Sequence, residues 1–298
     1  MPHEPRNGDM TGQTTVNIHP FGTALGAEIR GVDLSAPQSA KVLEQIHAAW
    51  LDNLVLVFRN QSLTDDDLVN FSRHFGDLDI VPGWEPFSPE GHPEVLVVSN
   101  VQEDGTAIGV LGDGEASWHT DMAYIPVPPP ASLLYSLEVP ETGGDTSFMN
   151  MYAALNTLPD DLRQAITGKT LNHDSSHDSG GNLRPNHNMF TSIAEAPGAR
   201  HPIIRTHPDT GRPALFLGRR LHAWIIGEDI EQSDALLDRL WDHCTNDDLT
   251  YRHRWQEGDL LMWDNRVTMH RREHFDAGAR RVMHRTQLKG NWGVEAAA

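Results

Sequence analysis

Short apolar segments of strand length, separated by prolines and glycines, dominate this sequence from Asp77 onward. We expect strands at residues 94–100, 131–139, 146–150, 215–217, 249–255, 259–263 and 281–288. Many short strands with Pro and Gly between them are typical of a closed or two-sheet β architecture. Helical spacing of apolar residues is confined to residues 39–51, 64–75, 160–167 and 233–241. We therefore expect a mainly β fold with peripheral helices.

The N-terminal part adds two β features, a hairpin over residues 16–29 and a continuous apolar strand over 53–58. Residues 1–15 contain no apolar run, so we predict a flexible lead rather than a signal peptide. Residues 16–290 are expected to form one domain, followed by a tail at 291–298. Within it, residues 173–202 are polar and aperiodic, as is typical of a lid or insert loop.

The overall composition excludes several classes of protein. The net charge of −19 argues against binding to a phosphate backbone, which needs a basic surface. Apolar stretches stay well short of the roughly 20 residues that a membrane span requires. Cys244 is the single cysteine, so the chain cannot form an intrachain disulfide and a cytoplasmic location is favoured. We interpret this cysteine as a packed core thiol.

A pair of candidate metal ligands lies at His119 and Asp121, in the tetrapeptide Trp118-His-Thr-Asp121. If this segment is a strand, alternate side chains share one face, and both residues then point toward the same ion. Such a spacing is common by chance in a chain with 17 histidines. The pair alone is therefore weak support for a metal site.

A third candidate ligand is His270, which follows the apolar strand 259–263 and precedes a predicted loop. Two histidines and one carboxylate form the facial triad of non-haem iron(II) oxygenases, which leaves coordination positions for a co-substrate and dioxygen. The same ligands also serve zinc hydrolases. These residues alone leave both chemistries open.

Two arginines follow at positions 281 and 285 and share one face of the predicted strand 281–288. If that face is internal, each guanidinium needs an anion, because an unpaired buried charge costs several kcal/mol. Guanidinium groups bind carboxylates in a planar, bidentate manner. The arginines therefore favour a pocket for carboxylates beside the metal.

Taken together, the motifs resemble the taurine/2,4-dichlorophenoxyacetate (TauD/TfdA-like) family of iron(II)- and 2-oxoglutarate-dependent dioxygenases. The matching segments, in family order, are Trp118-His-Thr-Asp121, Gly143-Gly-Asp-Thr146, Thr206-His-Pro-Asp-Thr-Gly-Arg212, Trp263-Asp-Asn-Arg-Val-Thr-Met-His270 and Arg281-Val-Met-His-Arg285. The similarity extends from about residue 16 to residue 290. The resemblance implies a double-stranded β-helix (jelly roll, cupin-like) core and frequent self-association into homo-oligomers.

The resemblance also implies roles for individual residues. His119, Asp121 and His270 match the family's iron ligands, and Thr146 with Arg281 matches the groups that hold the distal carboxylate of 2-oxoglutarate. The implied reaction uses dioxygen, hydroxylates a small organic substrate and releases succinate and carbon dioxide. No catalytic residue beyond the metal site is implied.

The substrate pocket departs from that of the taurine-oxidising relatives. Arg285 matches the residue that faces the acidic group of the substrate, but the histidine expected after Phe75-Gly-Asp-Leu78 is absent. We expect Glu115, Trp84 and Leu221 to line the pocket as well. A small carboxylate-bearing substrate, rather than taurine, is the resulting hypothesis.

Two local features and two other functions stay open at this point. We interpret His173-Asp-Ser-Ser-His-Asp178 as a polar, substrate-facing or solvated segment rather than a second metal motif, and Arg219-Arg220 as either lid or surface charges. A metal-dependent hydrolase or isomerase with the same two-histidine, one-aspartate ligands is one alternative function. A non-catalytic β-barrel binding protein is the other.

Overall fold

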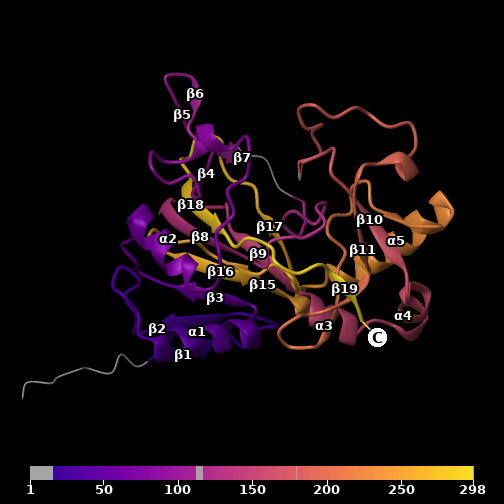
Figure 1. Ribbon diagram of the computed structural model, residues 1–298, viewed down its shortest axis with the longest axis horizontal. Helices are drawn as coiled ribbons and strands as arrows, with labels where there is room; N and C mark the ends of the chain where they lie inside the picture. Colours follow the sequence, from indigo (N-terminus) through magenta and orange to yellow (C-terminus); the bar gives the residue numbers. More distant parts are fainter. Residues whose placement is uncertain (1–15, 112–116, 179, 298) are drawn as a thin grey trace, which may run out of the picture.

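A computed structural model describes residues 16–111, 117–178 and 180–297 of the chain (Figure 1). The expected lead at residues 1–15 therefore lies outside the described residues. Strands outnumber helices, which confirms a mainly β fold with a few helices. Among the described residues, no helix combines the length and apolar character needed to cross a membrane.

An eight-stranded sheet forms the centre of the molecule. Its order is β1 (Asn17–Pro20), β2 (Ala27–Arg30), β3 (Val55–Phe58), β16 (Leu260–Asp264), β8 (Ala131–Glu138), β18 (Val282–Gln287), β4 (Leu96–Ser99) and β7 (Val110–Leu111). The β2–β3 and β4–β7 pairs are parallel, whereas the other neighbours are antiparallel. The hairpin predicted at residues 16–29 is present as β1 and β2.

Both faces of the eight-stranded sheet are buried at β3, as the continuous apolar run of this strand predicts, whereas the edge strand β1 is exposed. On one face, Leu56 and Phe58 pack with residues of α1 (Ala40–Asn53) and α2 (Asp65–Arg73). On the other face, Val55 and Val57 belong to a second core. The sheet is therefore the middle layer of three.

Helix α2 begins where the sequence predicts. The Thr64 hydroxyl accepts a hydrogen bond from the backbone N–H of Asp67, and the Asp67 carboxylate accepts one from the N–H of Thr64. This reciprocal capping satisfies two donors that the first turn would otherwise leave unpaired. Asp65, Asp66 and Asp67 also place negative charge at the positive end of the helix dipole.

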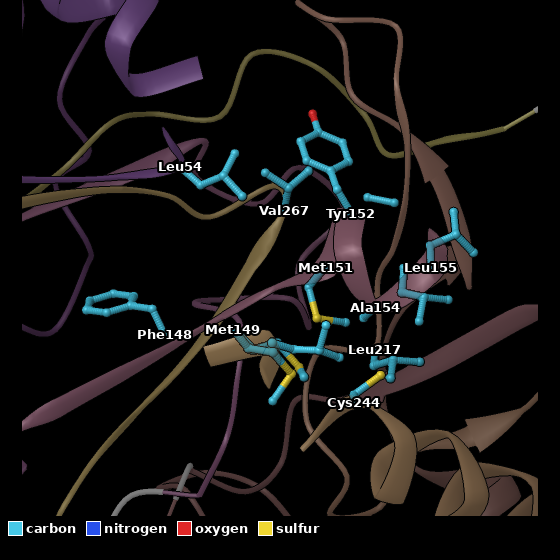
Figure 2. Close-up of a cluster of buried hydrophobic side chains, with 14 of the residues drawn as sticks. Leu54, Phe148, Met149, Met151, Tyr152, Ala154, Leu155, Leu217, Cys244 and Val267 are labelled. Atoms are coloured by element: carbon cyan, nitrogen blue, oxygen red, sulfur yellow. The ribbon is translucent and has the colours of Figure 1, made fainter. Parts of the chain in front are cut away.

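A smaller sheet covers the second face. It consists of β15 (Thr250–His253), β9 (Thr146–Asn150) and β17 (Thr268–Arg272), all antiparallel. Phe148 and Met149 of this sheet share one buried cluster with Met151, Leu155 and Leu217 (Figure 2). The two sheets thus enclose a common core.

Cys244 lies in the same cluster, fully buried beside Leu217 (Figure 2). Burial raises the pKa of its thiol to about 12. A neutral thiol in an apolar core is a poor nucleophile. The interpretation of this cysteine as a core residue is confirmed.

The remaining elements lie outside these two sheets. The helices are α3 (Met151–Asn156), α4 (Asp160–Ile166) and α5 (Ile230–Cys244), with 3-10 turns at Glu85–Phe87, Ile193–Glu195 and Asp247–Leu249. The outer strands are β5 (Gln102–Glu103), β6 (Thr106–Ala107), β10 (Thr170–Asp174), β11 (Gly198–Pro202), β12 (Ile204–Thr206), β13 (Pro213–Leu215), β14 (Trp224–Ile225) and β19 (Glu295–Ala296). They form the sheets β11-β10-β14, β13-β12-β19 and β5-β6. Strands β5 and β6 lie near β4 and β7, and α4, α5, β10 and β11 lie at the other side of the molecule (Figure 1).

Two expectations about chain segments were wrong, those for 173–202 and for 215–217, and one strand was not predicted. The segment 173–202 is not loop throughout, because its first two residues end β10 and its last five form β11, which pairs with β10. Strand β17 was missed, since it follows β16 after only a short turn and its sequence Thr268-Met-His-Arg-Arg272 is mostly polar. The strand predicted at 215–217 lies two residues earlier, at β13.

Candidate functional site

His119, Asp121 and His270 converge at the open end of the core between the two sheets. The Nε2 atoms of His119 and His270 lie 3.7 Å and 3.9 Å from Oδ1 of Asp121. The three donor atoms all fall within 4.8 Å of one another, and each side chain is at most 17% exposed. Residues separated by about half of the chain length are thus brought to one point.

Backbone hydrogen bonds hold the two histidines side by side. The N–H of His119 donates to the carbonyl of His270 at 2.9 Å, and the N–H of His270 donates back at 2.8 Å. His270 is in the middle of β17, so its expected place before a loop was wrong. The histidine rings lie 4.3 Å apart between their centroids.

The expected strand at residues 118–121 was also wrong. His119 makes only isolated bridges, to Arg219 and His270, and Asp121 begins a turn that continues through Met122 with φ +50°. Strand alternation is therefore not what aims His119 and Asp121 together. The bridge to β17 places the first residue, and side-chain tethers place the second.

Asp121 is fixed by two side chains, one from β8 and one from the turn after β16. Its backbone N–H donates to Oδ1 of Asn265 and its carbonyl accepts from Nδ2 of the same residue, both at 2.9 Å. The hydroxyl of Ser132 donates to Oδ2 of Asp121 at 2.9 Å. Oδ1 is left to face the histidines. A ligand held in this way needs little reorganisation when a metal binds.

A buried ionic network holds the segment that carries Asn265. Asp264 accepts hydrogen bonds from Arg266 at 2.7 and 2.8 Å and lies 3.0 Å from Nε2 of His207. Arg266 also reaches Asp209 at 2.7 Å. Burial alone raises the pKa of Asp264, but Arg266 and His207 outweigh it and the net shift is downward. The Thr206–Arg212 motif thus supports the site from outside, whereas the Trp263–His270 motif both supports it, through Asp264, Asn265 and Arg266, and supplies the ligand His270.

The electrostatics of the three candidate ligands suit a divalent cation. Burial acts to raise the pKa of Asp121, but His270, Arg285 and His119 lower it to about 2. Burial, with a contribution from the neighbouring His119, lowers the pKa of His270 to about 3, and burial also lowers that of His119. At neutral pH the carboxylate is anionic and both imidazoles are neutral. These are the protonation states that metal ligands require.

Hydrogen bonding also favours the tautomer of His119 that suits a ligand. Its Nδ1 lies 2.8 Å from the carbonyl of Ser117, which can only accept. Nδ1 therefore carries the proton, and the lone pair of Nε2 points toward Asp121. Two imidazoles and one carboxylate on one face match the donor set of mononuclear iron(II) centres. The residues present fit such a metal.

Arg281 is a second unusual group, a buried cation that has no acidic partner in the part of the chain that the structure describes. Its side chain is 4% exposed, and its Nε has no hydrogen-bond partner among the described residues. Burial, with repulsion from Arg272, lowers its pKa to about 9. A guanidinium in this state is stabilised by an anion that enters the site.

Thr146 is connected to Arg281 through Trp255. The indole Nε1 of Trp255 donates to the Thr146 hydroxyl at 3.0 Å, so the hydroxyl proton stays available for an acceptor. The guanidinium of Arg281 lies 6.0 Å from the Trp255 ring. Sequence reasoning placed Trp255 only at the end of a strand and missed this role. The motif at 143–146 begins with a turn that requires glycine: Gly143 has φ +78°, and a Cβ there would lie 2.6 Å from the carbonyl oxygen of His274.

A cavity of about 480 Å³ opens beside the triad. Its walls include two of the three predicted lining residues, Trp84 and Leu221, together with Arg285. Glu115, the other predicted lining residue, lies outside the described residues. Sequence reasoning missed Tyr124 and Arg184, which also line the cavity. A polar loop carries no periodic signal that could have identified them.

The two arginines left undecided have different positions. Arg219 lines the cavity and donates hydrogen bonds to the carbonyls of His177 and Asp178. Arg220 points away and pairs with Asp234 and Asp238 of α5 at 3.0 and 2.7 Å. Only the first is a candidate for contact with a ligand.

Arg285 lies between the metal ligands and the cavity. Its Nη1 is 3.5 Å from Oδ1 of Asp121, its guanidinium lies 5.4 Å from the Trp84 ring, and its side chain is 11% exposed. Strand β18 carries it, after an irregularity in register between Val282 and Met283. A cation is thus present where a substrate would meet the metal.

Comparison with known proteins agrees with this geometry. The family model described as "Taurine catabolism dioxygenase TauD, TfdA family" matches residues 17–287. The (S)-phenoxypropionate/alpha-ketoglutarate-dioxygenase of Delftia acidovorans is 31% identical over 96% of this chain and 99% of its own. The alpha-ketoglutarate-dependent 2,4-dichlorophenoxyacetate dioxygenase of Cupriavidus pinatubonensis is 32% identical over 91% and 96%. The crystal structure of AAD-2 with Mn(II) and N-oxalylglycine aligns with a TM-score of 0.78 at 29% identity, over 94% and 98% of the two chains.

Proposed function

The chain belongs to the TauD/TfdA family of dioxygenases, and from this premise we propose that its prime substrate is a small organic molecule with a carboxylate group held by Arg285. As a family member it is an Fe(II)- and 2-oxoglutarate-dependent dioxygenase that oxidises a small organic substrate and releases succinate and carbon dioxide. Its two facing sheets fit a double-stranded β-helix, or jelly roll, with the site at one open end.

In this proposal His119, Asp121 and His270 hold the iron. When bound, the iron supplies the activation of dioxygen that is coupled to decarboxylation of 2-oxoglutarate. The chain contributes one negative charge from Asp121 and two neutral imidazoles, and it fixes them through Asn265 and the bridge to β17. The protein thereby orients the reactants.

Arg281 and Thr146 are proposed to hold the distal carboxylate of 2-oxoglutarate. The guanidinium offers a charged donor, and the Thr146 hydroxyl offers a second one because Trp255 occupies its acceptor side. A hydrolase or isomerase with the same ligands has no need of a buried, unpartnered cation beside its metal. This orphaned group therefore favours 2-oxoglutarate chemistry over both alternatives.

The position of Arg285 carries the substrate proposal. A cation at the cavity wall, 3.5 Å from Asp121, can direct an anionic substrate toward the metal. Trp84 and Leu221 supply apolar surface around it, and the charges of Arg184 and Arg219 in the same cavity balance those of Asp174 and Asp178. Such a cavity favours an organic acid with an apolar body. We also propose a cytoplasmic location, in keeping with the single cysteine, and a homo-oligomeric state.

The Arg285→Met variant should weaken binding of the prime substrate selectively. A charge-assisted hydrogen bond contributes about 1.5–3 kcal/mol, so KM for the acid should rise roughly tenfold to 150-fold. The KM for 2-oxoglutarate should change little, because Arg281 holds that molecule. A succinate-release screen of small carboxylic acids, each paired with its neutral amide, first identifies the substrate, and steady-state kinetics then give the KM values.

The matched control is Arg220→Met, which removes a surface arginine that pairs with α5. Its kinetics should equal those of the unmodified enzyme. If Arg285 instead only balances the charge of Asp121, then Arg285→Met lowers kcat and leaves KM for the acid unchanged. That outcome, or equal turnover of acid and amide, would reject the carboxylate proposal.

A further inference from the structure

A second cluster of metal-binding side chains, Asp174, His177 and His222, lies outside the triad. Oδ2 of Asp174 is 2.8 Å from Nδ1 of His177 and 3.1 Å from Nδ1 of His222. The two Nδ1 atoms are themselves 3.1 Å apart. Three donor atoms from two segments of the chain thus form a closed triangle.

The size of this triangle fits a bound ion. Zinc-type ions bind imidazole nitrogen and carboxylate oxygen at about 2.0–2.2 Å, so two ligand atoms lie about 3 Å apart at a right angle and about 3.4 Å apart in a tetrahedral site. The sides of 2.8–3.1 Å are closer to the right-angle arrangement. Hydrogen bonds alone explain the arrangement less well, because at most one proton can lie along each side. With both N–H groups aimed at Asp174, the two imidazole nitrogens would still be held in contact with no bond between them.

The carboxylate is prepared for such a role. The Asp174 side chain is fully buried, and its Oδ1 accepts hydrogen bonds from the backbone N–H and the hydroxyl of Ser176 at 2.8 and 2.6 Å. Oδ2 is therefore the atom left for His177 and His222. Support of one carboxylate oxygen by the protein is typical of metal ligands.

The three residues lie at the end of one strand, in the loop that follows it, and just before a second strand that pairs with the first. Asp174 ends β10, His177 lies just beyond it, and His222 precedes β14, which pairs with β10. His177 is almost fully buried, whereas the His222 side chain is 27% exposed and leaves a path from solvent. The ring of Phe190 packs edge-on against both histidines, at 5.9 Å and 5.0 Å.

Among the described residues, Arg184 and Arg219 lie at the cluster; Arg184 donates through Nε to the backbone carbonyl of His177 at 3.1 Å, and Arg219 faces Asp174. Nη2 of Arg219 lies 3.8 Å from Oδ2 of Asp174, beyond hydrogen-bond distance. Its guanidinium donates instead to the backbone carbonyls of Asp174, His177 and Asp178. Arg219 will weaken the affinity of the cluster for a cation. Its backbone contacts nevertheless hold it beside Asp174 without occupying the donor atoms.

We propose that Asp174, His177 and His222 bind a divalent ion of the zinc class, separate from the iron of the triad. An ion there joins the loop after β10 to the start of β14. Asp174, Asp178 and Leu221 line the same cavity as the triad, so the ion would fix one wall of the substrate pocket. The sequence-based interpretation of His173–Asp178 as a polar, substrate-facing or solvated segment lacked the third ligand, which lies 45 positions after His177.

Metal stoichiometry of tag-free, chelator-stripped protein tests this proposal. Under anaerobic conditions, equilibrium dialysis against Co²⁺ should give two ions per chain for the unmodified protein. His222→Ala and His270→Ala should each bind one, and the double variant should bind none tightly. Asp174→Asn, which keeps the shape of the side chain, should weaken the second ion at least about tenfold. His92→Ala is the matched control, since His92 pairs with a single surface carboxylate, Asp66.

Thermal unfolding gives an independent readout that does not require activity. In the His270→Ala background, Zn²⁺ should raise Tm, because an ion that binds only the folded state stabilises it. The additional substitution His222→Ala should remove that increase. One ion in the unmodified protein that only His270→Ala removes would overturn the second site and leave the triad intact. Unchanged stoichiometry in both His222→Ala and Asp174→Asn would overturn it as well.

Discussion

Replacing Asp121 with alanine is expected to abolish substrate-dependent succinate formation, with kcat/KM lowered at least about a thousandfold. A bound metal contributes several kcal/mol to transition-state stabilisation, and each 1.36 kcal/mol corresponds to tenfold in rate. Asp121 supplies the only anionic donor of the triad, with a pKa of about 2. Its loss also leaves Arg285, 3.5 Å away, without its partner. The loss of the Asp121 carboxylate and the unpaired positive charge of Arg285 then both oppose binding of a cation.

The measurement is succinate release together with product formation, each at saturating iron. Asp66→Ala is the control, because this exposed aspartate pairs only with His92 on the surface. Loss of activity in Asp121→Ala, with circular dichroism and Tm near those of the unmodified enzyme, fits a role in metal binding. Substrate hydroxylation retained by Asp121→Ala would mean that the ligand assignment is wrong.

Replacing Arg281 with methionine is expected to raise KM for 2-oxoglutarate about a hundredfold to ten-thousandfold. A bidentate guanidinium–carboxylate pair has two charge-assisted hydrogen bonds, each contributing about 1.5–3 kcal/mol. Arg281 is buried with its Nε unpartnered, and its pKa is lowered to about 9. The charged group therefore destabilises the protein until an anion binds. Methionine has a similar volume and removes this cost.

Arg281→Met should therefore have two opposite effects, on stability without ligand and on binding of 2-oxoglutarate, which can be measured separately. Tm without ligand should stay equal or rise, while the increase in Tm caused by 2-oxoglutarate should disappear. Arg280→Met is the matched control: the adjacent arginine is exposed and pairs with Glu138 at 2.6 Å. A large fall in Tm without ligand, or an unchanged KM for 2-oxoglutarate, would contradict the proposed carboxylate clamp.

Local rules of the sequence were sufficient for most elements of the fold. The capping residues at Thr64 and Asp67 define the start of α2. The apolar run that ends at Phe58 correctly indicates a strand buried on both faces, although the strand begins at Val55 and Asn53 still belongs to α1. They failed at β17, where a mostly polar segment is held by pairing with β9 rather than by its own pattern. Pairing between distant strands is not visible in the periodicity of either one.

The candidate site shows the same division. His119, Asp121 and His270 do converge, but the expected strand alternation is not the reason; a bridge to β17 and the tethers of Asn265 hold them. The arginines at 281 and 285 could be proposed from the cost of burying them together with their spacing after His270. His222 could not be connected to Asp174, because only the pairing of β14 with β10 brings the two together.

Anaerobic addition of Fe(II) and then 2-oxoglutarate to purified protein, followed by visible absorption, tests the iron site directly. We expect the weak charge-transfer band of an iron–2-oxoglutarate chelate at one equivalent per chain. The band should be lost in Asp121→Ala, and Arg281→Met should require a much higher concentration of 2-oxoglutarate to produce it. Absence of the band in the iron-loaded unmodified protein, or an equal band in Asp121→Ala, would contradict the assignment of His119, Asp121 and His270 as the iron site.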